Sequence, residues 1–281
     1  MSEELIHNEQ TRAFTSLVWN KGEELYRDLP WRGIDDAYGV LVSEVMLQQT
    51  QVARVLNYWQ RFMELFPTID ALAAAETPLV LEKWQGLGYN RRALALKRCA
   101  EQCSAEFGGE LPSTFDELVA LPGIGPATAG GVMAFAHNKP VVYLETNVRT
   151  VFLHHFFPNQ DEVSDKQIIP LVEATCSADN PRGWYYALLD YGNYLKATLP
   201  NPSRRSKHHA VQSPFEGSRR QKRAWIVRYM LAGQTVEFEQ LEAELNAYER
   251  EQGRPEVAPD ELRSIVDDLV VEGFFDASQI S

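Results

Sequence analysis

LPGIGPATA, residues 121–129, is the most informative stretch of this sequence. A helix is expected to begin near Thr114, where Glu117 three residues later completes the pattern of a capping box, and to end at Pro122. Pro126 suits the first position of a second helix, because the N–H that proline lacks would have no partner there anyway. The stretch therefore predicts two helices joined by a very tight turn.

The glycines of this turn make it a candidate for binding an anion. Gly123 and Gly125 permit positive φ, and without side chains they leave the first backbone N–H groups of the second helix open. Such a helix N-terminus can hold a DNA phosphate, which positions the DNA without reading its sequence. The alternative is a plain corner between two helices, since any such corner needs a flexible joint.

Helical periodicity dominates the body of the chain. Between residues 45 and 66 apolar side chains recur at three- and four-residue steps, and Pro67 ends the run. Further helices are expected near residues 70–75, 78–85, 91–107, 114–121, 126–137, 145–157, 165–176 and 182–197. Strand-like alternation is scarce, so the predicted fold class is all-α.

Two segments near the end of the chain differ from this body. Residues 200–220 are rich in proline, serine and charge and are typical of a linker or an extended arm. The residues that follow, 224–281, contain three short helical patterns that end in a Gly-Phe-Phe step. They predict a small winged-helix-like module.

The charge of the chain is unevenly distributed. A net charge of −12 taken alone argues against a nucleic-acid partner. Residues 204–223, however, hold seven basic side chains and one acid, so this segment is +6 and the remainder is −18. Because salt screens charges beyond about 10 Å, a local basic stretch can still contact phosphates. A solvated linker is the alternative interpretation.

Composition also limits the cellular setting. The chain has no run of about 18 apolar residues, and its first ten residues, MSEELIHNEQ, are unlike a secretory signal, so we expect a cytoplasmic, nucleoid-associated protein. Its three cysteines cannot form a disulfide framework. Cys99 and Cys103 lie one helical turn apart without a third ligand nearby, and we interpret them as structural residues.

Several further motifs follow the order and spacing found in one enzyme superfamily. They are DLPWR (28–32), SEVMLQQTQV (43–52), GLGY (86–89), LETNVRTV (144–151) and ALLDYG (187–192). With the hairpin at 121–129, they make the chain resemble the helix-hairpin-helix DNA glycosylases, and the first two are closest to the MutY-type adenine glycosylases.

This resemblance implies a two-lobed helix-hairpin-helix glycosylase fold. One lobe would comprise residues 1–30 and 138–200 and carry Glu145. A helical-barrel lobe, residues 31–137, would carry Glu44 and the hairpin. The basic arm, 201–223, and the winged-helix-like module, 224–281, would follow.

Glu44 and Glu145 are the candidate catalytic residues. Glu44 lies on or beside an apolar helix stripe, where partial desolvation raises the pKa of a carboxyl and favours it as a proton donor. The resemblance implies that Glu44 protonates the adenine; the alternative is a solvent-facing helix residue. Glu145 occupies a position where the family usually has aspartate, so its carboxylate is displaced by one methylene. Its alternative role is to cap a helix.

The residue at position 127 bears on the type of reaction. Bifunctional relatives carry a lysine there, whereas this chain has Ala127. Without that amine no Schiff base forms, so a monofunctional hydrolase without lyase activity is predicted. Its predicted substrate is adenine mispaired with guanine or 8-oxoguanine. Thymine or uracil opposite guanine, another damaged base, and a DNA-binding protein without catalysis remain alternatives.

The resemblance also implies further site residues. The base pocket would contain Trp31, Arg32, Asn147 and Asp190, although Trp31 could equally be a core aromatic and Asp190 a buried structural carboxylate. Contacts to DNA would come from Gln48, Gln49, Asn90, Gly123, Gly125, Arg204, Arg205, Arg219 and Arg220. Asn90 replaces an aromatic residue that is frequent in the family and cannot stack on a base.

No metal or organic cofactor is expected. MutY relatives usually hold an iron–sulfur cluster with four cysteines after the ALLDYG segment, and residues 196–223 of this chain contain none. A monovalent cation bound at the hairpin is the one exception that we consider. The predicted partner is double-stranded DNA with a mispaired or damaged base, bound by a monomer away from membranes. The tail is too short and too helical for the 8-oxoguanine-sensing domain of full-length MutY proteins.

Overall fold

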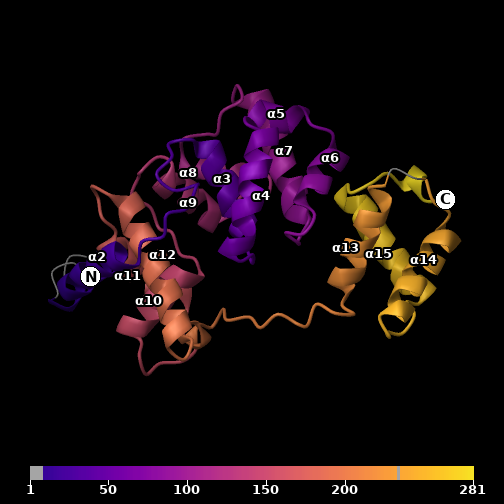
Figure 1. Cartoon of the computed structure of the whole chain (residues 1–281). Coiled ribbons are helices and arrows are strands. Elements are labelled where there is room, and N and C mark those ends of the chain that lie inside the picture. Colours follow the sequence, from indigo (N-terminus) through magenta and orange to yellow (C-terminus); the bar gives the residue numbers. More distant parts are fainter. Residues whose placement is uncertain (1–8, 233–234) are drawn as a thin grey trace. The chain divides into compact units, whose positions relative to one another are not determined.

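The computed structural model describes residues 9–232 and 235–281 (Figure 1). Their helices divide into two compact units. The first unit contains residues 9–45 and 110–211, and the second contains the other described residues. These residues include no β-strand and only two isolated bridges, so the predicted all-α class is confirmed. The division into two compact units does not test the domain boundaries expected from the sequence. Those boundaries stay a prediction.

The two units divide the helices as follows. The first holds α2 (Glu9–Leu25), most of α3 (Ala37–Leu47), α8 (Phe115–Ala120), α9 (Pro126–Phe135), α10 (Thr146–Phe156), α11 (Asp165–Thr175), α12 (Pro181–Thr198) and the 3₁₀ turn η1 (Pro202–Arg205). The second holds α4 (Val52–Leu65), α5 (Ile69–Ala74), α6 (Thr77–Trp84), α7 (Arg91–Glu106), α13 (Arg219–Met230), α14 (Phe238–Glu251), α15 (Pro259–Glu272) and the 3₁₀ turn η2 (Ala277–Gln279). None of these helices is long and apolar enough to cross a membrane.

Helix α12 organises the first unit. It packs against α2, α9 and α10, and the rings of Phe14, Phe152 and Trp184 meet in the core. At Gly192 a Cβ atom would lie 2.2 Å from the backbone oxygen of Asn147, so only glycine allows α10 to approach α12 this closely. This approach sets the position of the first turn of α10.

The predicted hairpin is present in the first unit, with one correction. Helix α8 begins after its cap Thr114, whose hydroxyl accepts from the N–H of Glu117, but it ends at Ala120, before the predicted Pro122. Gly123 has φ 74° as expected. Gly125 permits positive φ as well but does not adopt it: φ is −88°, because the residue before a helix takes an extended conformation.

The basic segment is also partly different from its prediction. Residues 202–207 are not an extended arm: η1 packs on α10, and Pro202, Ser203 and Ser206 are buried. The backbone N–H of Val163 donates to Arg205 O at 2.9 Å, and Lys207 N–H donates to Val163 O at 3.0 Å. Only the connection after this segment, residues 209–214, lacks regular structure (Figure 1).

In the second unit, Arg92 connects two loops. Its buried guanidinium donates to the carbonyl oxygens of Met46 and Gln48 on one side and to those of Leu87 and Gly88 on the other, at 2.8–3.2 Å. One loop carries Gln49 (φ 55°) and the other Tyr89 (φ 48°), non-glycine residues in a conformation that costs free energy. The five-donor fork of arginine suits this role because it reaches several carbonyls at once.

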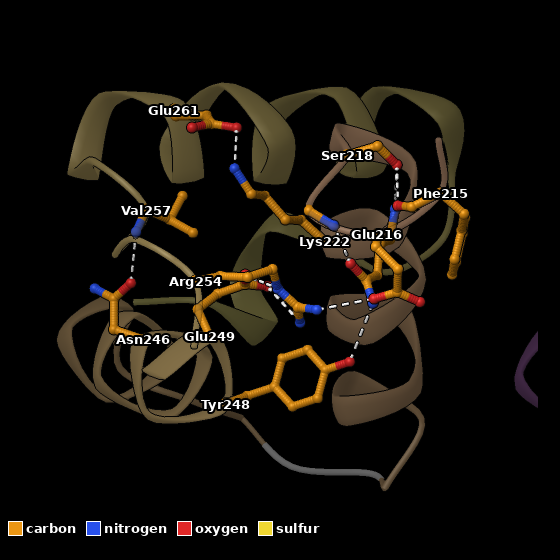
Figure 2. A network of polar contacts seen from close by, with 12 residues as sticks. Phe215, Glu216, Ser218, Lys222, Asn246, Tyr248, Glu249, Arg254, Val257 and Glu261 are labelled. Atoms are coloured by element: carbon orange, nitrogen blue, oxygen red, sulfur yellow. Dashed lines mark hydrogen bonds and ion pairs between the residues drawn. The ribbon is translucent and has the colours of Figure 1, made fainter. Parts of the chain in front are cut away.

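The end of the chain forms three helices, α13–α15, with a bridge between Val236 and Ile280. Figure 2 shows the polar network at their centre: the Arg254 guanidinium contacts buried Glu249 at 2.6 Å and Glu216 at 2.9 Å. Asn246 accepts from the N–H of Val257 at 2.7 Å. These contacts define a packed module, while its likeness to a winged helix stays a prediction.

The acidic end of the chain neutralises part of the basic segment. Among the described residues, four ion pairs join α13 to α15: Arg219–Asp268 at 2.6 Å, Lys222–Glu261 at 2.7 Å, Arg223–Glu272 at 2.5 Å and Arg223–Asp268 at 3.6 Å. The positive charge counted over residues 204–223 is therefore not a single surface available to phosphates. Its second half is largely compensated by carboxylates of α15.

Candidate active site

Glu44 lies half-buried on α3 in a setting that favours its protonated form. The Tyr143 hydroxyl donates to its Oε2 at 3.1 Å. A Cβ atom on Gly131 would lie 2.3 Å from the same oxygen, so this glycine makes room for the carboxyl. Burial raises the pKa of Glu44 to about 8, helped by the negative charge of Glu145 and opposed by the Tyr143 hydrogen bond. At neutral pH Glu44 therefore holds a proton.

The second carboxyl, Glu145, is the N-cap of α10. Its Oε1 accepts from the backbone N–H groups of Asn147 and of Val148, the latter at 2.9 Å, and its Oε2 accepts from the Asn147 side chain at 3.3 Å. Burial raises the pKa of Glu145, and these N–H groups with the charge of Lys196 oppose that rise. Glu145 therefore does cap α10, which is the alternative role considered for it. The capping N–H groups bond mainly one of its two carboxylate oxygens.

The two predicted acids lie within electrostatic reach of each other in one compact unit. Tyr143, which bonds Glu44, stands only two residues before Glu145. One carboxyl is kept protonated by burial, whereas the other receives helix N–H donors that favour its charged form. A protonated acid beside an acid whose N–H donors and neighbouring lysine oppose the effect of burial is compatible with the division of roles that glycosidic bond cleavage requires.

Arg32 and Asp190, expected in the base pocket, form a buried ion pair. The two Arg32 Nη atoms contact the two carboxylate oxygens of Asp190 at 2.7 and 2.9 Å, and Arg27 Nε reaches the same carboxylate at 2.5 Å. The Arg32 guanidinium also lies over the Tyr186 ring, 4.5 Å from its centroid. These contacts support the structural role for Asp190, and Trp31, 5% exposed, fits a core aromatic.

Asn147 lies where the sequence placed it, beside Glu145. Its side-chain amide donates to Glu145, while its Oδ1 is buried and has no hydrogen-bond partner among the described residues. This acceptor, beside the candidate carboxyl of Glu145, is available to orient a water or an N–H donor.

Three residues of this site were not predicted from the sequence: Gly131, Tyr143 and Lys196. Tyr143 reads as part of an apolar run, and the only available signal was that a buried tyrosine needs a partner for its hydroxyl. Gly131 follows a second glycine inside a predicted helix, which signals a close approach of another group. Lys196 is a half-buried amine whose charge acts on Glu145, and burial lowers its pKa; no spacing pattern pointed to it.

The predicted DNA-contacting residues fall into different settings. Gln48 and Gln49 are exposed after α3, and Asn90 precedes α7. At Gly125 an added Cβ would meet no atom within 4 Å, so the space in front of the α9 N-terminus is open. Gly123 is exposed in the same turn.

The four predicted arginines differ in their contacts. Arg204 is exposed, with no ion pair among the described residues. Arg205 donates to the carbonyl oxygen of Leu153 at 3.3 Å. Arg219 pairs with Asp268, as above, and Arg220 donates to the Tyr89 hydroxyl at 2.7 Å. Of these four side chains, that of Arg204 alone makes no ion pair or hydrogen bond among the described residues.

The cysteines do not fit an iron–sulfur cluster. A four-iron cluster takes four thiolates, whereas the chain has three cysteines, two of them buried on α7. Within residues 9–232 and 235–281, no group of three or more His, Cys, Asp or Glu side chains is placed to hold a metal ion.

Residues 42–173 match the sequence profile of the HhH-GPD superfamily of base excision DNA repair proteins. The chain therefore contains a helix-hairpin-helix domain of this superfamily, which confirms the resemblance deduced from the motifs.

Its similar relatives include adenine DNA glycosylases. That of Mycolicibacterium smegmatis is 40% identical over 165 residues, which are 58% of this chain and 56% of that protein. That of Mycobacterium tuberculosis is 44% identical over 137 residues, 48% of this chain and 44% of the other. The human protein is 35% identical over 207 residues, 69% of this chain and 37% of the other. The chain thus spans about half or less of these relatives.

Solved structures show the same fold. A thermostable thymine-DNA glycosylase superposes with a TM-score of 0.61 and 23% identity, covering 66% of this chain and 87% of that one. An endonuclease III bound non-covalently to DNA gives a TM-score of 0.54 and 18% identity, covering 73% and 90%. At such identities the likeness concerns the fold, and it confirms the predicted helix-hairpin-helix glycosylase architecture.

Proposed function

We propose that this chain is a DNA N-glycosylase that releases adenine mispaired with guanine or 8-oxoguanine. The proposal depends chiefly on one observation: the carboxyl of Glu44 is enclosed by the Tyr143 hydroxyl and the Gly131 backbone, within electrostatic reach of Glu145. The similarity to adenine DNA glycosylases of three organisms supports the choice of base. The fitting partner is double-stranded DNA, bound by a monomer in the cytoplasm.

The reaction would begin with the target base turned out of the duplex. Glu44 donates its proton to a ring nitrogen of the adenine as the bond between C1′ and N9 breaks, and the bonding electrons leave with the base. The negative charge of Glu145 stabilises the positive charge that develops on the sugar. Water then adds to C1′ and returns one proton to Glu44, leaving an abasic site.

The hairpin would hold the DNA for this step. The first N–H groups of α9 face open space beyond Gly125, where a phosphate gains from both hydrogen bonds and the helix dipole. Arg204 and Lys207, exposed in the same compact unit, add unpaired positive charge.

One observation favours a second candidate, a DNA-binding protein without catalysis. Glu145 caps α10 in place of the usual aspartate, and a cap requires no catalytic role. This second candidate predicts that the protein binds the duplex but releases no base. A measurement of base release therefore distinguishes the two candidates.

A panel of duplexes tests the proposed function. Three duplexes carry adenine, thymine or uracil opposite guanine, and a fourth carries adenine opposite 8-oxoguanine. Alkali cleaves the strand at every abasic site, and a gel reveals the products. We expect release of adenine. Release of thymine or uracil alone would assign the chain to the mismatch-pyrimidine class, and binding without any release would favour the second candidate.

The absence of a lysine at position 127 predicts monofunctional hydrolysis. Treatment of the reaction with borohydride is expected to trap no covalent adduct with DNA, because Ala127 supplies no amine for a Schiff base. Lys196 is an amine near Glu145 that the sequence did not reveal. A good yield of adduct would overturn the prediction, and its loss in Lys196→Met would identify the nucleophile.

Gly131→Ala is expected to lower base release by about a hundredfold, because a methyl group there displaces the Glu44 carboxyl. Alanine favours a helix over glycine by roughly 1 kcal/mol, so the helix itself is not weakened. Single-turnover rates and the melting temperature Tm give the two effects separately. Ala129→Gly on the same helix is the control: it lowers Tm but leaves the Glu44 carboxyl in place. Unchanged activity in Gly131→Ala would refute the placement of Glu44.

A further inference from the structure

Tyr143 is the polar residue most firmly held around Glu44. It is 4% exposed, and its ring packs edge-on against Phe135 and Tyr185, with centroids 5.1 and 5.3 Å away. Its backbone N–H donates to the Tyr185 hydroxyl at 3.1 Å. The ring and the main chain are thus fixed independently, so the hydroxyl has a defined direction.

That direction is toward one oxygen of Glu44. The Tyr143 hydroxyl donates to Oε2 at 3.1 Å, and this same oxygen lies against the bare backbone of Gly131. Both the hydroxyl donor and the glycine backbone are thus on the Oε2 side of the carboxyl. The two oxygens of the carboxyl are therefore in unequal surroundings.

Unequal surroundings determine where the proton of a carboxylic acid resides. The carbonyl oxygen of a protonated carboxyl is the better acceptor, so a fixed donor at Oε2 favours the proton on Oε1. The Tyr143 hydroxyl remains a neutral donor, because burial and the charges of Glu44 and Glu145 raise its pKa. Once Glu44 has given up its proton, the same hydrogen bond becomes charge-assisted and stronger.

We propose that Tyr143 is a positioning residue that places the transferable proton of Glu44 on Oε1 and stabilises the carboxylate left after transfer. This inference depends on the proposed function for its kinetic consequences, but the hydrogen bond acts on the titration of Glu44 whether or not a base is released.

Tyr143→Phe tests the proposal in two independent ways. The rate of adenine release under single-turnover conditions is expected to fall about tenfold at pH 7, the effect of one net hydrogen bond to a charged group. The alkaline limb of its pH profile, which reports the titration of Glu44, is expected to move up by about one pH unit. In parallel, NMR of protein with ¹³C-labelled glutamate follows the Glu44 carboxyl directly and needs no activity.

Tyr191→Phe is the matched control. It removes a buried hydroxyl that bonds His155 Nε2 at 2.9 Å and has no part in holding Tyr143, so Tm is expected to fall while the Glu44 titration stays in place. A Tyr143→Phe protein whose Glu44 titrates at the wild-type pH would overturn the proposal even if its activity falls. A wild-type protein that releases no base, but whose Glu44 titration still shifts in Tyr143→Phe, would refute the proposed function alone.

A second variant covers failure of Tyr143→Phe to fold. Replacement of Tyr143 by 3-fluorotyrosine keeps the ring and strengthens the donor, so the Glu44 titration is expected to move down in pH. No movement in either protein would overturn the inference.

Discussion

Glu44→Gln is expected to lower base release at pH 7 by about 10²–10⁴-fold while duplex binding is retained. Glutamine has nearly the same shape and still accepts the hydrogen bond from Tyr143, but its amide cannot give a proton to the leaving base. Single-turnover kinetics on an adenine mispair and a binding titration on the same duplex separate the two properties. The exposed Glu64 supplies the control, since Glu64→Gln removes an equal charge on α4 and is expected to change neither.

The pKa of Glu44 also predicts how the wild type depends on pH. Since the acid must be protonated, the rate is expected to stay level below about pH 8 and to fall about tenfold per pH unit above it. Stability follows the same titration. The folded state keeps a proton that the unfolded state loses near pH 4.5, so stability is fully present below that pH and declines until about pH 8.

Glu44→Gln removes this decline, so at pH 9 its Tm is expected to exceed that of the wild type. A Tm profile with the same slope in both proteins would show that Glu44 is not the titrating group. An unchanged rate in Glu44→Gln would end the assignment of Glu44 as the acid.

Substitutions at Glu145 are expected to separate catalysis from helix capping. Glu145→Gln keeps the oxygen that accepts from the N–H groups of α10 but loses the charge, so base release is expected to fall by about 10²–10³-fold with little change in the free energy of unfolding. Glu145→Ala loses both, and its unfolding free energy is expected to fall further, by about 0.5–2 kcal/mol. Chemical denaturation and single-turnover rates measured on each protein give the comparison.

Glu145→Asp completes this series because it keeps the charge on a shorter arm. It is expected to retain more activity than Glu145→Gln, since the charge and not the chain length carries the effect. Thr68→Ala is the control for cap loss alone: Thr68 caps α5 by accepting from the N–H of Ala71 at 3.1 Å. Full activity in Glu145→Gln would show that Glu145 is a cap only and would favour the non-catalytic candidate.

Several features of the fold could be predicted because their causes are local. The helical class follows from apolar periodicity, and the start of α9 follows from Pro126 and the glycine before it. The cap at Thr114 depends on residues three apart in the chain. The motifs around Glu44 and Glu145 were sufficient to name both acids.

Other features could not be predicted, and each depends on residues far apart in the chain. The Tyr143 hydroxyl meets Glu44 across 99 positions, and Arg32 meets Asp190 across 158. Asp190 was given either a pocket role or a structural one, and it is paired with two arginines; the basic segment was interpreted as a stretch that could contact phosphates, and it is half neutralised by α15. Charge counted along a sequence does not reveal such partners.

The sequence by itself determined the helical class and the glycine hairpin and nominated the two candidate acids, because turn residues and periodic side chains act over a few positions. Only the tertiary structure decided which donors meet the oxygens of each acid, which arginines find acidic partners and which tyrosine contacts Glu44. Those outcomes depend on how closely helices pack, and that is set by single atoms such as the Cβ that Gly131 lacks.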